Sequence, residues 1–230
     1  MKLKSFFIVA GLTVATTALK AQALELKGGV NLANITTTNS GDINDANELT
    51  SFHVGVLGVF PLGTKIVSLQ PGIFYTGKGA ETIIGNESSA TYSKQTFNPR
   101  YIEVPVNLVF TLPIGKTNGV FLGAGPYGAI GVGGKSKVNG RLAGVDFSSE
   151  DNIKFSKDNP TTSGEEGSGF GILRRFDYGI NALAGIEVQK LTLSAGYGFG
   201  LAKLQSGTNS SENENNKHRV LSFSLGYRFH

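Results

Sequence analysis

Apolar and polar residues alternate with a period of two along most of the chain. The segment 101–112 is the clearest example, because every even position is apolar whereas the odd positions include Glu103 and Asn107. The final segment, 219–229, has the same period. A period of two predicts β-strands, and about ten residues is the length that a tilted strand needs to cross a bilayer.

The same alternation recurs eight times, so the sequence predicts eight strands. The glycine-rich fifth segment is included on its length and position, although its two faces cannot be assigned. The predicted strands cover 24–34, 52–62, 66–78, 101–112, 119–131, 174–188, 191–204 and 219–229.

The connections between these strands alternate strictly between long and short. Bacterial outer-membrane barrels have this asymmetry, with short turns in the periplasm and long loops outside the cell. An even number of strands then places both termini at the periplasmic end. The short connections are 61–65, 113–118 and 189–190, and the long polar ones are 36–49, 80–98, 132–173 and 205–218.

The charged residues of the strands lie opposite continuous rows of Leu, Ile, Val, Phe and Tyr. A secreted lipocalin-like carrier, the main alternative with eight strands, would have an apolar interior and a polar exterior. We place the charged faces inside and the apolar faces against lipid. Only a closed barrel satisfies the backbone hydrogen bonds of strands in hydrocarbon. The sequence therefore predicts an all-β, eight-stranded antiparallel up-and-down transmembrane β-barrel.

The first 23 residues have the pattern of a secretory signal peptide. Lys2 and Lys4 precede a short apolar run, and small residues at Ala21 and Ala23 offer two cleavage sites. The alternative, an N-terminal membrane anchor, would need a longer apolar run. Residues 24–230 then form one outer-membrane barrel domain. Losing three lysines lowers the formal net charge from +4 to +1, which gives no reason to expect a nucleic-acid partner. The absence of Cys excludes a lipoprotein anchor and disulfides.

Charged residues on the inward faces form two predicted groups, one near each end of the barrel. The lumen of an eight-stranded barrel is just wide enough for side chains to fill it, so these charges should pair and plug it. Arg228 should meet Glu25 where the first and last strands close the barrel. The predicted periplasmic group is Glu25, Lys27, Glu187 and Arg228, and the predicted outer group is Lys78, Glu103, Arg175 and Asp177.

The sequence gives weaker support for a nucleotide, metal or catalytic site than for the charged groups of the lumen. The segments 123–128 and 129–136 resemble nucleotide-binding motifs, but neither precedes a helical pattern that could receive phosphate. His53, His218 and His230 lack metal-ligand spacing and are expected in water at the rim or in loops. A hydrolytic pair of His53 and a loop serine is conceivable, although no spacing singles one out. We therefore expect no enzyme activity, no metal and no cofactor. Acidic residues of the longest loop do not match a Ca²⁺-binding loop and are expected to be solvated surface: Asp146, Glu150, Asp151, Asp158, Glu165 and Glu166.

Several short motifs resemble those of the PorT-like outer-membrane β-barrel family. They are Leu69–Tyr75 followed by Gly77-Lys78-Gly79, then Tyr101–Val106, Gly123–Tyr127 and Leu225–Phe229. The resemblance spans the mature chain and implies a barrel in the outer membrane. A role in supporting protein secretion is known for a member of that family.

We expect a non-catalytic outer-membrane protein with a plugged lumen, which acts structurally or through its long external loops at the cell surface. The expected partners are outer-membrane lipid and another envelope protein or a secretion complex. The alternatives are an accessory component of secretion or transport across the outer membrane, a narrow pore, and a barrel-embedded hydrolase.

Overall fold

The computed structural model describes residues 23–36, 38–39, 42–43, 48–86, 88–156, 172–204 and 217–229. These residues form β-strands joined by turns and bends. Within this part of the chain, no helix is long and apolar enough to cross a membrane.

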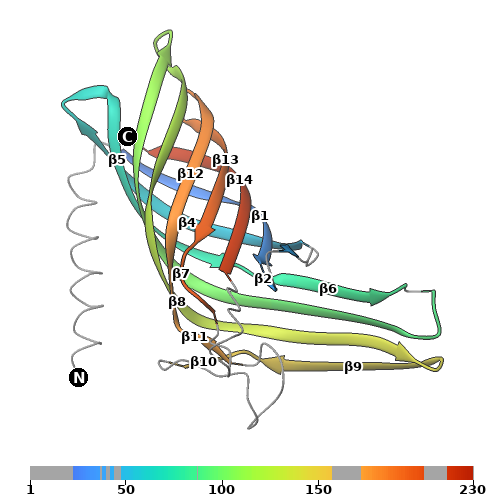
Figure 1. The fold of residues 1–230 in the computed structure, drawn as a ribbon. Helices are drawn as coiled ribbons and strands as arrows, with labels where there is room; N and C mark the ends of the chain where they lie inside the picture. The colour runs from blue at the N-terminus through green and yellow to red at the C-terminus, as the bar shows by residue number, and fades with distance from the viewer. Residues whose placement is uncertain are drawn as a thin grey trace.

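Eight antiparallel strands close into a barrel (Figure 1). The neighbours around it run β7-β5-β4-β1-β14-β13-β12-β8, and a direct β7–β8 pairing completes the circle. The predicted fold class and number of strands are confirmed. The barrel strands are β1 (Ala23–Thr36), β4 (Leu49–Leu62), β5 (Thr64–Gly77), β7 (Tyr92–Ile114), β8 (Asn118–Leu142), β12 (Phe176–Val188), β13 (Leu191–Gly200) and β14 (Lys217–Phe229).

The three short connections lie together at one end of the barrel (Figure 1). Gly63 alone separates β4 from β5, and its φ of 75° is a conformation that glycine adopts without strain. Residues 115–117 join β7 to β8, and Gln189-Lys190 joins β12 to β13. We call this the short-turn end and the opposite one the long-segment end.

Two segments expected to be polar loops, 80–98 and 132–173, instead contain β-structure. β6 (Ala80–Gly85) pairs with the first part of β7, and β9 (Val145–Asn152) pairs with the last part of β8. Together with residues 92–100 and 131–142, these strands form a four-stranded arm that extends beyond the barrel (Figure 1). The strands of the arm were not predicted from the sequence, because strands outside a bilayer need no continuous apolar face.

An apolar plug lies where the arm joins the barrel. It combines residues from the end of β1, the arm, the segment before β12 and the segment after β13. Two short strands, β10 (Lys154–Ser156) and β11 (Ile172–Arg174), pair in parallel beside it, and β2 (Thr38–Asn39) pairs with β3 (Asp42–Ile43). The buried members of the plug are Ile35, Ala80, Phe97, Ile153, Leu173 and Leu204, and Phe155 packs against them.

The apolar faces of the barrel strands point outward, as predicted. Leu122, Leu193 and Leu225 are 56 to 60% exposed although they lie within regular strands of the barrel. Such a continuous apolar exterior is unstable in water and suits hydrocarbon. On β8, whose faces the sequence could not assign, Val120 and Leu122 face outward and Phe121 and Tyr127 face inward.

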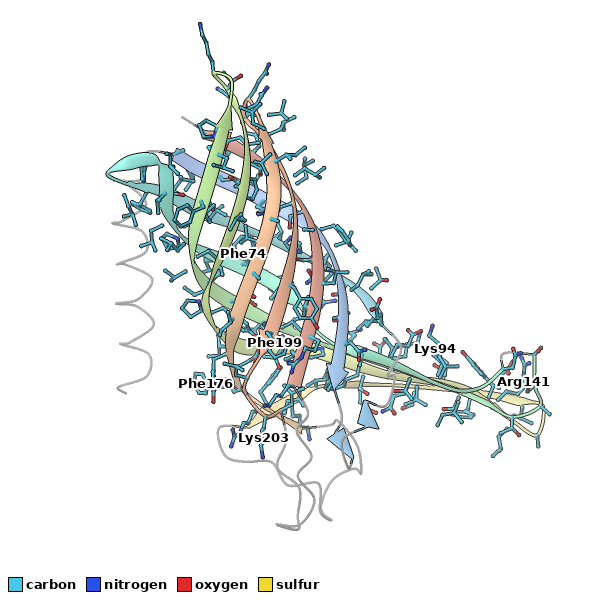
Figure 2. The ribbon with its side chains drawn as sticks, turned by 45° about the horizontal axis from the view of Figure 1, so that its top comes forward. Phe74, Lys94, Arg141, Phe176, Phe199 and Lys203 are labelled. Atoms are coloured by element: carbon cyan, nitrogen blue, oxygen red, sulfur yellow. The ribbon has the colours of Figure 1, made fainter. Side chains whose placement is uncertain are left out.

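Glycines on the inward faces make room for aromatic rings in the narrow lumen. A Cβ on Gly179 would lie 2.6 Å from the ring of Tyr127, and one on Gly185 would lie 2.5 Å from the ring of Phe121. The ring of Phe74 similarly occupies the space beside Gly55. Figure 2 shows Phe74 within the barrel. The abundant glycine is therefore part of the packing of the interior.

Candidate functional site

The lumen contains a cavity of about 110 Å³, so side chains do not fill it throughout. A water molecule in the liquid has a share of about 30 Å³, so this space suits several waters or one small polar molecule. Polar and apolar atoms share its wall about equally, and every strand of the barrel contributes to it. Polar lining residues include Lys27, Asn31, His53, Gln70, Asn107, Asn181, Ser194, Ser222 and Ser224.

Three of these residues form a continuous hydrogen-bonded row on β14, β4 and β1. The Ser224 Oγ lies 2.9 Å from His53 Nε2, and His53 Nδ1 lies 2.8 Å from Asn31 Oδ1. The Asn31 Nδ2 donates to Thr76 Oγ1 and to the carbonyl oxygen of Gly77, both at 2.9 Å. All three residues are buried from bulk solvent.

Strand register brings this row together. Gly29 on β1 lies opposite both His53 on β4 and Ser224 on β14. A Cβ on Gly29 would lie 2.9 Å from the His53 ring and 1.9 Å from a backbone oxygen of β14. The histidine therefore reaches Ser224 across β1 because position 29 has no side chain. Asn31, the next inward residue of β1, meets the other side of the ring.

An ion-pair cluster lies toward the long-segment end of the cavity. Lys78 Nζ lies 2.7 Å from Glu103 Oε2 and 2.9 Å from Asp177 Oδ2. Asn181 donates to Glu103 at 3.0 Å, and Tyr127 donates to Asp177 at 3.2 Å while its ring lies 4.0 Å from the Lys78 ammonium. This inner triad of Lys78, Glu103 and Asp177 is shielded from solvent and surrounded by polar partners.

A second ion-pair cluster lies at the short-turn end. Arg228 is directly opposite Glu25 in the pairing of β1 with β14, and their side chains approach to 3.1 Å. Arg228 also pairs with Glu187, and Thr192 donates to Glu25 at 2.8 Å. Position 226 is glycine, and a Cβ there would collide with the Glu25 carboxylate.

Two of the predicted network residues do not join these clusters. Lys27 lines the cavity, and within the described chain it makes no ion pair with a carboxylate. Arg175 is partly buried, and its Nε has no hydrogen-bond partner among the described residues. The structure therefore brings six of the eight predicted residues into two clusters and leaves one cation in the cavity wall.

Residues 20–206 match the family model of the outer membrane protein beta-barrel domain. The chain belongs to this family. It is therefore an outer-membrane β-barrel protein, with the apolar exterior that lipid requires.

Solved structures with similar folds include other outer-membrane proteins. Ail, the attachment invasion locus protein of Yersinia pestis, is 14% identical over 90% of this chain and 98% of its own, with a TM-score of 0.40. Neisserial surface protein A is 12% identical over 90% and 99%, with a TM-score of 0.40. OprG from Pseudomonas aeruginosa is 9% identical over 91% and 97%, with a TM-score of 0.44. No curated protein matches this outer-membrane barrel in sequence.

The expectation that the histidines lie in water is wrong for two of them. His53 is only 8% exposed, and its ring lies at the lumen cavity between two strands. His218 is 1% exposed, and its Nε2 lies 3.3 Å from the Tyr101 hydroxyl beneath the apolar plug. His230 lies outside the described residues. Both described histidines occupy inward positions, which their alternation with outward apolar neighbours could have indicated.

Sequence reasoning missed Tyr127 as part of the interior, and it missed the contacts that Tyr101 and Ser224 make there. Their positions on inward faces were readable for β7 and β14, but their contacts depend on strand register. Of the acidic loop residues, Asp146 and Glu150 form surface ion pairs in the arm, whereas Asp158, Glu165 and Glu166 lie outside the described residues. No group of metal-binding side chains occurs in the part of the chain that the structure describes.

Proposed function

We propose that this protein acts at the cell surface as an interaction protein and that the arm is its contact surface. The supporting observation is the contrast between the two faces of the arm. One face exposes Ile84, Leu142, Val145 and Phe147, which are 45 to 70% exposed, and we call these four residues the apolar arm face. Ile84 and Phe147 share one row across the sheet, and Leu142 pairs with Val145 at its tip.

The opposite face of the arm is charged. Arg141 pairs with Asp146 at 2.7 Å, Lys94 pairs with Glu81 at 2.6 Å, and Lys135 pairs with Glu150. Lys94 and Arg141 lie along the arm in Figure 2. A sheet in water with one charged and one apolar face is typical of a protein with a binding partner, because exposed apolar patches are otherwise avoided.

The root of the arm is anchored to the barrel. Phe97 and Ala80 lie on the same face of the sheet as the apolar arm face, and both are buried in the plug at the barrel mouth. Toward the tip, the side chains of Leu142 and Val145 are 63 and 70% exposed. The barrel can thus present this surface on a fixed support.

The orientation and processing of the chain are part of this proposal. The short turns point to a periplasmic end containing both termini, which puts the arm outside the cell. We further propose that residues 1–23 are a cleaved signal peptide and 24–230 the mature barrel. The mass of the purified protein distinguishes cleavage after Ala21 from cleavage after Ala23.

Photo-crosslinking tests the surface role. A benzophenone amino acid is placed either at Val145, on the apolar arm face, or at Ser148, on the charged face of the same strand. Illumination of intact cells should give a protein adduct from position 145 and little from position 148. Equal adducts from both positions, or none from either, would contradict the proposal.

The alternative, a PorT-like accessory role in secretion or transport, rests on the short sequence motifs and not on the broader family match. The same photo-crosslinking experiment distinguishes this alternative from the surface role. A secretion component crosslinked at position 145, together with a secretion defect when Val145 is changed to Asp, would favour that role.

We also propose that the lumen is plugged and does not conduct ions. The support is the plug at one end and the two ion-pair clusters on either side of the cavity. Planar bilayers containing the purified barrel should show no stable single-channel steps. A reproducible conductance would favour the narrow pore.

A further inference from the structure

We propose that Ser224 is an activated nucleophile, with His53 as its base and Asn31 as the residue that positions the base. This inference goes beyond the surface role, since the three residues lie in the lumen and not on the arm. It rests on the direction of each hydrogen bond in the row.

The amide of Asn31 can be oriented from its neighbours. One of its polar atoms is 2.9 Å from the carbonyl oxygen of Gly77, which only accepts hydrogen bonds, so this atom is the Nδ2 donor. The other atom, Oδ1, then faces His53 Nδ1 at 2.8 Å. An amide oxygen only accepts, so His53 must carry its proton on Nδ1.

This tautomer leaves a lone pair on His53 Nε2. The Ser224 hydroxyl, 2.9 Å away, donates its proton toward that lone pair. A nucleophile, a base and a third group that fixes the tautomer of the base form the general arrangement of activated serine hydrolases. The residues come from three adjacent strands, so the barrel wall holds them in place before any substrate arrives.

The cavity supplies a place for a reacting group. Ser224, His53 and Asn31 all line it. Lys27 also lines it and makes no ion pair within the described chain, so its ammonium can stabilise a developing oxyanion. The volume of about 110 Å³ suits the acyl group of a small uncharged ester or a similar small electrophile, which can pass side chains that block a steady ion current.

The chemical step conserves atoms and charge. The Ser224 Oγ attacks the ester carbonyl carbon while His53 Nε2 takes the hydroxyl proton. The bond to the leaving alkoxide breaks, and His53 returns the proton to give the alcohol. Water then attacks the acyl-serine through the same base, which releases the carboxylic acid and restores the serine hydroxyl.

Diisopropyl fluorophosphate is the first probe, because its reaction with an activated serine releases fluoride and leaves a stable phosphoryl adduct. The folded full-length barrel in detergent should gain one adduct, and peptide mass analysis should place it on Ser224. It should also hydrolyse 4-nitrophenyl acetate. Heat-unfolded protein should not be labelled, because the row no longer exists.

Amino-acid substitutions distinguish a loss of serine reactivity from a loss of folding. Ser224→Ala should lose the adduct, and Ser148→Ala, which changes a serine of the arm outside the cavity, should keep it. His53→Gln can still hydrogen-bond but cannot take the proton, so the rate of labelling should fall about 100-fold or more. Heat-modifiable gel mobility confirms that each variant is folded. No adduct on the folded wild type, or equal rates for the wild type and His53→Gln, would overturn the proposal.

Discussion

Removing Lys78 should destabilise the barrel more than removing any surface cation. The Lys78 side chain is 4% exposed, and its two carboxylate partners are 1 and 12% exposed. In the variant Lys78→Met, both carboxylates would face each other without a counter-ion. Breaking a buried ion pair in this way costs about 3–5 kcal/mol.

The structure favours the lower end of this range. Asp177 keeps its hydrogen bond from Tyr127, and Glu103 keeps that from Asn181. We therefore expect a loss of about 3 kcal/mol in the free energy of unfolding. With a urea dependence of about 1–3 kcal/mol per molar, the unfolding midpoint should fall by about 1–3 M.

The assay is urea unfolding in lipid vesicles, followed by circular dichroism and gel mobility because the chain has no Trp. The triple variant Lys78→Met, Glu103→Gln, Asp177→Asn removes every charge of the inner triad and should recover most of the loss. Lys135→Met, which breaks an exposed pair, should leave the midpoint unchanged. An unchanged midpoint for Lys78→Met, or a triple variant as unstable as the single one, would refute the reasoning.

Three further predictions concern other parts of the molecule. Gly179→Ala should destabilise the barrel by about 1–3 kcal/mol, since its Cβ would lie 2.1 Å from a backbone oxygen of β13, whereas Gly128→Ala, with nothing within 4 Å, should be tolerated in the same unfolding assay. Arg228→Ala should lower the urea midpoint and leave localisation in the outer-membrane fraction intact, and an unchanged midpoint would count against its pairing with two carboxylates. The hydrogen bond and charge of Arg141 lower the pKa of Asp146. This pair therefore makes a small contribution to the stability of the arm above the ordinary carboxyl pKa, and the contribution is lost as the pH falls through the lowered pKa. Amide exchange in the arm, corrected for the intrinsic pH dependence, should therefore increase in acid for the wild type and not for Asp146→Asn.

The barrel could be predicted from sequence because lipid and lumen impose opposite demands on alternate residues. That contrast is strong in β7, where even positions between 102 and 112 are apolar and face outward. It fails in the middle of β8, where Gly123 and Gly125 face inward and the small residues Ala124 and Pro126 face outward. It is also weak in the arm, which lies beyond the closed barrel.

The candidate site could not be predicted because it depends on register and not on spacing. Ser224 and His53 are 171 positions apart and meet only because both lie opposite Gly29. A shift of one residue in either strand pairing would turn one of them toward lipid. The pairing of Arg228 with Glu25 was easier to anticipate, because the first and last strands of a closed barrel must be neighbours.

Topology in intact cells tests the central claim, a membrane-spanning barrel with its arm at the cell surface. The chain has no Cys, so single substitutions give unique labelling sites. A membrane-impermeant maleimide should label Val145→Cys at the arm tip in intact cells. It should label Lys116→Cys, in the short turn between β7 and β8, only after the outer membrane is opened. Labelling of Lys116→Cys but not Val145→Cys in intact cells would contradict the account.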